Sequence, residues 1–159
     1  MKDKNIGTVH TIGDSAGGYH ALLTGILLHS KKAREQFGLS VSDLPAVGSI
    51  NLICGSFHAS PKAFAGIYFD PDKKLPPFIY DLTKAMEPRS FPPLVLTTGD
   101  KDSLLRENRI LKARLEEMNI PFSYKEFSSA DDRVMHHVFS IAHPTWPESI
   151  ESMDMFIHR

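Results

Sequence analysis

A serine between two glycines is the first residue whose surroundings suggest chemistry. The run Gly13-Asp14-Ser15-Ala16-Gly17 follows an apolar stretch and precedes a helical pattern. A Gly-x-Ser-x-Gly turn between a strand and a helix lifts the serine hydroxyl above the sheet, and it points the backbone N–H of Ala16 to where an oxyanion would form. We expect glycine at both Gly13 and Gly17 because side chains there would collide in so tight a turn. The run predicts a nucleophilic Ser15, and the simpler alternative is a serine cap at a helix N-terminus.

A serine hydroxyl becomes an effective nucleophile when a neutral histidine accepts its proton and a carboxylate orients that histidine. The sequence places a candidate acid, Asp102, after its third predicted strand, and a candidate base, His137, in the loop after the fourth. The structural alternatives are a helix N-cap for Asp102 and a surface loop position for His137. Three other residues compete for the two roles: Asp100, His136 and His143. The residue types alone leave both choices open.

Alternating strands and helices are expected to position these residues. The patterns predict strands over residues 6–13, 46–54, 94–98 and 122–127, and helices over residues 19–37, 103–119 and 145–157. Residues 46–54 are apolar at nearly every position, as in a strand covered on both faces, whereas residues 122–127 alternate like an edge strand. Strands separated by helices predict an α/β fold with about four mostly parallel strands, flanking helices and right-handed crossovers.

The boundaries of two helices and one loop have local signals. The helix over residues 19–37 is expected to end at Gly38. Thr145-Trp146-Pro147-Glu148 resembles a capping box that opens the last helix. The spacing of Ile150, Met153 and Ile157 predicts that these side chains form its buried face. Residues 128–143, between the last strand and this helix, are expected to form a loop.

Residues 57–93 break the alternating pattern. This Pro/aromatic-rich insertion contains seven of the eleven prolines and seven of the fifteen aromatic residues of the chain. Long regular elements are improbable across so many prolines, so we expect short helices and loops that pack on the rest of the molecule. Two roles are open for its aromatic side chains, which either line an acyl pocket or belong to the core: Phe57, Phe64, Tyr68, Phe69, Phe78 and Tyr80.

Composition excludes several classes of protein. The chain has 159 residues, of which 42% are apolar and 23% charged, which is typical of one ordinary globular domain. Its net charge of −1 provides no basic excess for nucleic acid. Its longest apolar run is far shorter than a membrane span, and no signal peptide is visible, so we expect a soluble, cytoplasmic protein.

Metal and disulfide chemistry find little support. A single cysteine, Cys54, excludes an intrachain disulfide and a paired-cysteine metal site, and we interpret it as a buried strand residue. His10 and His20 flank the Ser15 turn, but a metal pair would need further ligands, so structural roles are favoured. No metal and no cofactor is predicted.

Three motifs together resemble a known family. The run Gly13-Asp14-Ser15-Ala16-Gly17-Gly18 resembles the signature of the hormone-sensitive-lipase-like family of α/β-hydrolase carboxylesterases. Gly99-Asp100-Lys101-Asp102-Ser103-Leu104 resembles the acid loop of that family, with serine where proline is common. His137-Val138-Phe139 resembles its His-Gly-Phe motif, with valine in place of glycine. The resemblance runs from about residue 6 to the end of the chain, and it selects Asp102 over Asp100 and His137 over His136.

The resemblance implies a fold and an activity. The fold would be a partial α/β-hydrolase, and the activity would be hydrolysis of small-molecule carboxylic esters through an acyl-enzyme. Ser15 would attack the carbonyl, His137 would act as base and then as acid, and Asp102 would orient His137. The N–H of Ala16 would bind the oxyanion. A serine peptidase of the same fold is a further reading that these motifs allow.

The family also has features that this sequence lacks. A His-Gly-Gly segment, which completes the oxyanion hole upstream of the serine, occurs nowhere in the chain. We therefore expect residues 1–159 to form a single catalytic-type domain that lacks the usual N-terminal half. Its first strand, residues 6–13, has the apolar pattern of a buried strand and is expected to be buried on its faces. Without its usual neighbour it would become a sheet edge, which favours a homo-oligomer or association with a missing N-terminal half. The competing hypothesis is an inactive remnant that serves only as an oligomeric or interaction module.

Overall fold

The computed structural model describes residues 7–58, 70, 72, 74–129 and 131–157. Its sheet has four strands in the order β1-β2-β3-β4, and every neighbouring pair is parallel. The strands are β1 (Thr8–Asp14), β2 (Ala46–Ile53), β3 (Leu94–Gly99) and β4 (Phe122–Phe127). The predicted α/β fold with four parallel strands is confirmed.

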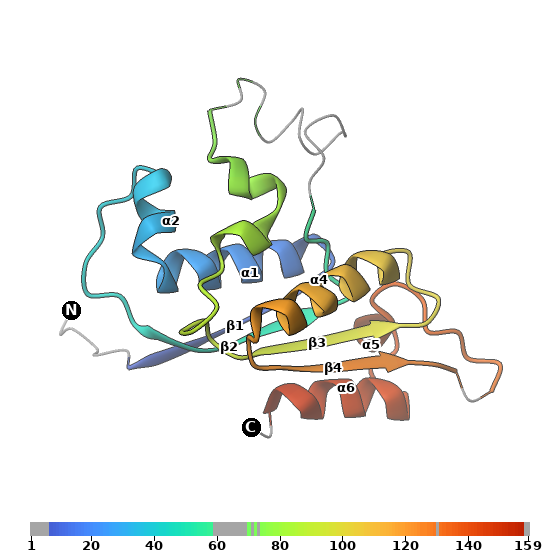
Figure 1. Ribbon diagram of the computed structural model, residues 1–159. Helices are drawn as coiled ribbons and strands as arrows, with labels where there is room; N and C mark the ends of the chain where they lie inside the picture. Colours follow the sequence, from blue (N-terminus) through green and yellow to red (C-terminus); the bar gives the residue numbers. More distant parts are fainter. Residues whose placement is uncertain (1–6, 59–69, 71, 73, 130, 158–159) are drawn as a thin grey trace.

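Helices cover the sheet in two layers (Figure 1). One layer contains α1 (Ala16–His29), α2 (Lys31–Gln36), α4 (Leu105–Met118) and two short 3₁₀ helices, η1 (Pro77–Tyr80) and η2 (Leu82–Ala85). On the opposite face α6 (Pro147–Ile157) runs beneath β4, with α5 (Phe139–Ala142) packed against it. None of the helices in the described part of the chain is both long and apolar enough to cross a membrane.

The two layers enclose two hydrophobic clusters. The larger lies between the sheet and α1, α4 and the 3₁₀ helices, and the smaller lies between the sheet and α5 and α6. Adjacent residues of β2 serve both clusters, since Leu52 belongs to the first and Ile53 to the second. This is the arrangement expected of a parallel strand with both faces covered, and it accounts for the continuous apolar run in β2.

The predicted helix over residues 19–37 is interrupted. The structure has α1 and α2 with a break at Ser30, whose backbone is extended (φ −91°, ψ 113°). The Ser30 hydroxyl accepts a hydrogen bond from the N–H of Ala33 (3.2 Å) and donates one to Glu87 (2.5 Å). Ser30 therefore caps a new helix that turns towards the 3₁₀ segment, and the second helix ends before Gly38 as expected.

The last helix is rotated from its predicted orientation. Ile150 is 52% exposed and Ile157 is 67% exposed, so the predicted buried face is wrong for both, while Met153 packs partly against the smaller cluster. Ser149 and Ser152 face inwards instead. The Ser152 hydroxyl donates to the buried hydroxyl of Thr97 in β3 (2.9 Å), so a polar partner on the sheet sets the rotation of the helix.

The start of the last helix also differs from the expected motif. Glu148 does not complete a capping box with Thr145, because one carboxylate oxygen binds Arg133 at 3.1 Å and the other has no partner among the described residues. The predicted loop over residues 128–143 is interrupted by the short helix α5.

One sheet edge is more exposed than its sequence suggested. Within the described sheet β1 pairs only with β2, and its residues are exposed or half-buried, with Ile12 52% exposed. The expectation that this strand is buried is wrong for the chain as described, because one side of β1 carries no strand. The edge position of β1, by contrast, agrees with the prediction.

The described part of the insertion has the predicted short helices. Phe57 and Phe78 are buried in the larger cluster and Tyr80 is half-buried, which favours core packing for the first two. Phe64, Tyr68 and Phe69 lie outside the described residues.

Candidate active site

Ser15 lies in a strained turn between β1 and α1. Its backbone has φ 52° and ψ −121°, a conformation that non-glycine residues rarely adopt. The turn is compact because Gly13 and Gly17 nearly touch, and a Cβ added at Gly13 would lie 2.1 Å from the carbonyl oxygen of Gly17. A side chain at Gly13 would therefore force the turn open, as expected of a strand–turn–helix that projects a serine.

The second glycine of the turn does not meet the expected collision. A Cβ at Gly17 would have only one close neighbour, the Asp14 carboxylate at 3.7 Å, which is an ordinary contact. The expectation that both flanking glycines are sterically required is therefore wrong for Gly17. Gly18 is the tighter position, because a Cβ there would lie 2.9 Å from the Cα of Gly55 in the loop after β2. The close approach of α1 to this loop depends on Gly18.

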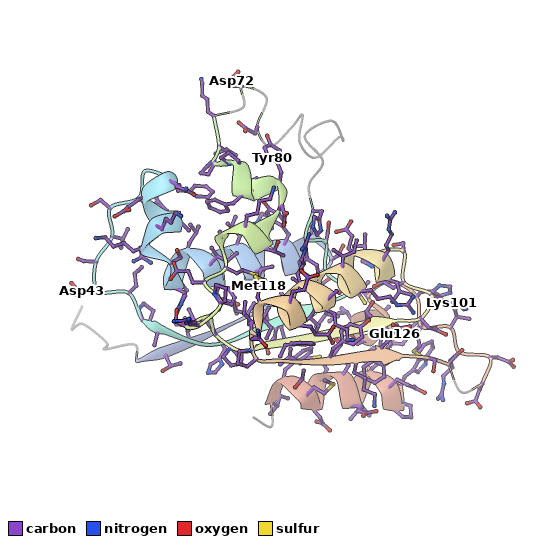
Figure 2. The ribbon with its side chains drawn as sticks, viewed as in Figure 1. Asp43, Asp72, Tyr80, Lys101, Met118 and Glu126 are labelled. Carbon is purple, nitrogen blue, oxygen red and sulfur yellow. The ribbon has the colours of Figure 1, made fainter. Side chains whose placement is uncertain are left out.

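Three side chains from different loops meet beside this turn. The Nε2 atom of His137 lies 2.8 Å from the hydroxyl oxygen of Ser15, and its Nδ1 atom lies 2.8 Å from a carboxylate oxygen of Asp102. A carboxylate only accepts hydrogen bonds, so Nδ1 carries the proton, and Nε2 of the neutral ring accepts the proton of the serine hydroxyl. All three loops follow the carboxyl ends of strands, the end where Figure 2 labels Lys101, with Met118 towards the opposite end.

Asp102 is buried and surrounded by hydrogen-bond donors. One carboxylate oxygen accepts from the N–H of Leu104 (2.8 Å), and the other accepts from the hydroxyl of Thr98 (2.8 Å). Burial alone would raise the pKa of Asp102, but hydrogen bonds from Leu104, Cys54, Thr98 and His137 outweigh it and hold the pKa below its ordinary value. The side chain is fully buried and stays ionised, which suits it to hold a histidine in one orientation.

The loop that carries His137 is held close to the end of β3. A Cβ at Gly99 would lie 2.0 Å from the carbonyl oxygen of Met135, and that oxygen accepts the N–H of Lys101 at 3.2 Å. Val138, next to His137, has a left-handed backbone (φ 52°). The His-Gly-Phe motif that this loop resembles has glycine at this position. The positive φ gives the physical reason for that glycine.

The competing residues lie in other environments. His136 is exposed, and His143 stacks on Trp146 with ring centroids 4.0 Å apart. Asp100 has a buried carboxylate oxygen without a hydrogen-bond partner among the residues that the structure describes. Of the candidates weighed from the sequence, the structure brings together Ser15, Asp102 and His137.

Some residues that support the site are not indicated by the sequence motifs. Glu107 in α4 accepts hydrogen bonds from Ser56 (3.1 Å) and from the N–H of Phe57 (2.8 Å), and the amide of Asn108 donates to Gly55 O (3.1 Å). Both side chains brace the loop after β2, which packs against the Ser15 turn. A signal for Asn108 was present, since it is a polar residue on the buried stripe of α4.

The same cluster is the one candidate metal site among the described residues. Ligand atoms of Cys54, Asp102 and His137 all lie within 4.8 Å of one another. Burial and the neighbouring Asp102 carboxylate raise the pKa of the Cys54 thiol to about 12, so the thiolate that a metal requires is disfavoured. The direct 2.8 Å hydrogen bond between His137 and Asp102 occupies the other two ligands. These residues do not fit a metal site.

Solved esterase structures share this fold. Esterase B from Lactobacillus rhamnosis has a TM-score of 0.78 and 25% identity, and the match covers 96% of this chain and 51% of the esterase. An esterase from Pyrobaculum calidifontis has a TM-score of 0.61 and 16% identity over 92% of this chain and 50% of its own. An esterase from Thermogutta terrifontis has a TM-score of 0.62 and 15% identity over 93% and 54%.

The chain has a partial α/β-hydrolase fold. The fold expected from the motifs and the resemblance to α/β-hydrolase esterases are both confirmed. The chain spans about half the length of the solved esterases, as the 51% coverage of esterase B indicates. No protein-family model matches the sequence, and no curated protein matches it.

Proposed function

We propose that this partial α/β-hydrolase carries the nucleophile, base and acid of a serine carboxylic-ester hydrolase. The observation that carries the proposal is the unbroken path from the Ser15 hydroxyl through His137 to Asp102, with 2.8 Å at both steps. The esterases of the same fold support an ester as the substrate class. The activity belongs to the whole enzyme, of which this chain corresponds to about half the length.

Each side chain has a defined part in the proposed reaction. As the Ser15 oxygen bonds to the ester carbonyl carbon, its proton passes to Nε2 of His137, and the buried Asp102 carboxylate stabilises the resulting imidazolium. The carbonyl oxygen becomes an oxyanion facing the N–H of Ala16. His137 then returns the proton to the departing alkoxide, which leaves an acyl group on Ser15. Water, deprotonated by His137, hydrolyses this acyl-enzyme and restores the serine hydroxyl.

The oxyanion hole of the proposed enzyme would be incomplete in this chain. Loss of one oxyanion donor typically reduces rates by about 10²–10³. The described residues offer the Ala16 N–H from the start of α1, and the sequence contains no His-Gly-Gly segment to supply a second donor. We therefore expect the isolated chain to form the acyl-enzyme slowly, and to react most readily with strongly activated acyl or phosphonyl reagents.

The first experiment tests the nucleophile directly. A fluorophosphonate probe should label wild-type protein at Ser15, and the Ser15→Ala variant should remain unlabelled. Esterase B from Lactobacillus rhamnosis has been solved with a tributyrin phosphonate inhibitor, so p-nitrophenyl butyrate is a suitable ester substrate for parallel assays. Labelling that persists in Ser15→Ala contradicts the assignment. Absence of labelling in a folded wild-type chain favours the inactive interaction module.

A matched pair of substrates separates the esterase from the peptidase. A butyryl ester and the corresponding butyryl anilide differ only in the leaving group. We expect release from the ester and none from the anilide, because the amine leaving group requires a better-formed acid step. Release from the anilide that Ser15→Ala abolishes would support a peptidase instead.

We also propose that the outer edge of β1 pairs with a strand of another polypeptide segment, either in a second copy or in an N-terminal half. The described strand bonds only to β2, and an edge with free N–H and C=O groups is a template for pairing. The exposed Ile12 provides an apolar anchor on this strand. Light scattering should detect self-association or binding to an added N-terminal half. Ile12→Lys should weaken either association. A stable monomer with a cooperative melt, unaffected by Ile12→Lys, contradicts this proposal.

A further inference from the structure

Cys54 has an unusual backbone for a buried side chain. It follows β2, is 0% exposed and has φ 47°, in the region that favours glycine. Ser15 and Val138 share this feature, so three of the five non-glycine residues with positive φ in the described chain lie at the candidate site. Such conformations cost free energy and persist where surrounding contacts hold them. For Cys54 one such contact is its N–H, which donates to the carbonyl of Thr97 (2.8 Å).

The backbone on both sides of Cys54 is hydrogen-bonded to the backbone of Ser15. The N–H of Ser15 donates to the carbonyl of Ile53 (3.0 Å), and the N–H of Ser56 donates to the carbonyl of Ser15 (3.1 Å). A regular parallel ladder would place this acceptor and this donor two residues apart, but they are three apart here, so one extra residue is accommodated between Ile53 and Ser56. The positive φ at Cys54 lies within this irregularity, so the backbone at Cys54 helps to set the position of the strained serine.

The side chain of Cys54 reaches the other end of the hydrogen-bonded path. Its sulfur lies within 4.8 Å of an Asp102 carboxylate oxygen and of a His137 ring nitrogen. Burial and the Asp102 charge raise the pKa of the thiol to about 12, so the sulfur keeps its proton, and its proximity allows the thiol to direct that proton towards the carboxylate. Besides His137, the other donors to Asp102 are Thr98 in β3 and Leu104 in the segment before α4.

We propose that Cys54 is a positioning residue that couples Ser15 to Asp102. Its backbone turn holds the serine, and its thiol helps to fix the carboxylate that orients His137. The inference rests on the proposed function, because it assigns these three residues to one reacting unit. It changes the interpretation of Cys54 from a passive core residue to one whose hydrogen-bonding group matters.

Two variants of Cys54 test the thiol. Cys54→Ala removes the donor, and Cys54→Ser keeps one on a side chain of similar shape. We expect Cys54→Ala to slow fluorophosphonate labelling of Ser15 by about three- to tenfold, the size expected for one hydrogen bond, and Cys54→Ser to restore most of the rate. The ¹H NMR signal of the His137 Nδ1 proton should shift in Cys54→Ala and return towards its wild-type position in Cys54→Ser. A merely structural role would lower the melting temperature without this pattern.

A matched control and a second readout keep the inference testable. Thr98→Val removes the hydroxyl donor from the same carboxylate at constant shape, and should shift the His137 signal in the same sense as Cys54→Ala. If the wild-type chain is folded but not labelled, the proposed nucleophile fails, while the NMR signal still reports the coupling. The inference is overturned if Cys54→Ala retains both the wild-type labelling rate and the wild-type His137 signal. If Cys54→Ala fails to fold, the test uses Cys54→Ser and Thr98→Val. The inference is overturned if the His137 Nδ1 proton signal of Cys54→Ser lies as far from its wild-type position as that of Thr98→Val.

Discussion

The turn after β1 and the loop after β4 each hold a non-glycine residue at positive φ, with different ψ angles and by different means. Ser15 and Val138 both have φ 52°. The turn after β1 is built for this, because Gly13 leaves room for the carbonyl of Gly17 and backbone hydrogen bonds hold the serine on both sides. The loop after β4 places a β-branched residue where glycine would fit without strain, and it depends on packing against the smaller cluster. Strain at a site can therefore be accommodated by local sequence or imposed by tertiary contacts.

The largest effect should follow loss of the acid that lies between the two turns. Asp102→Asn leaves the shape intact but removes the charge that fixes the histidine tautomer, which costs about 10⁴ in rate in serine hydrolases of this arrangement. We expect a loss of that order in the hydrolysis of p-nitrophenyl butyrate or in fluorophosphonate labelling. Asp100→Asn is the matched control, and it should change the rate by less than about threefold. Equal losses in both variants would show that the acid was assigned wrongly.

The next test separates the two glycines of the turn after β1. Gly13→Ala should destabilise the protein by about 3 kcal/mol, because the new Cβ overlaps the backbone carbonyl of Gly17. Gly17→Ala places its Cβ in ordinary contact and should change stability by less than about 1 kcal/mol, since alanine also favours helix α1. Urea unfolding measures both changes. Similar losses of unfolding free energy in the two variants would contradict the difference in space that the structure shows at these two glycines.

A smaller effect should distinguish the loop after β4. Val138→Ala loses packing but keeps a side chain in the left-handed region, whereas Val138→Gly loses the packing and relieves the strain. We expect the glycine variant to be about 1 kcal/mol more stable than the alanine variant. Chemical denaturation of the pair measures this difference. A glycine variant less stable than the alanine variant would show that Val138 carries no backbone strain.

The smallest effect concerns acid stability. The pKa of Asp102 in the folded protein lies below its ordinary value of 3.8, despite its burial, because hydrogen bonds stabilise the charged form. Such a group stabilises the fold fully above the unfolded pKa and loses this contribution as pH falls through the folded pKa. The free energy of unfolding should therefore fall more steeply below pH 3.8 for wild type than for Asp102→Asn. Parallel urea titrations at several pH values would reveal the difference, and identical pH dependence would contradict it.

Local patterns were sufficient for the strands, for their order along the chain and for the turn at Ser15. The reason is that strand periodicity and tight-turn geometry depend on neighbours in sequence. The break at Ser30 and the rotation of α6 were not predictable in this way. Each is decided by one partner distant in sequence, Glu87 for Ser30 and Thr97 for Ser152.

The candidate site divides in the same manner. The sequence by itself determined that Ser15 lies in a nucleophile-like turn, and motif resemblance favoured Asp102 and His137 over their neighbours. Only the tertiary structure decided that these side chains meet. Ser15 and His137 are 122 residues apart in the sequence and come together at the carboxyl ends of the parallel strands. It alone placed Cys54 between the serine turn and the acid. A thiol's role depends on the burial and charge around it, and those are properties of the folded chain.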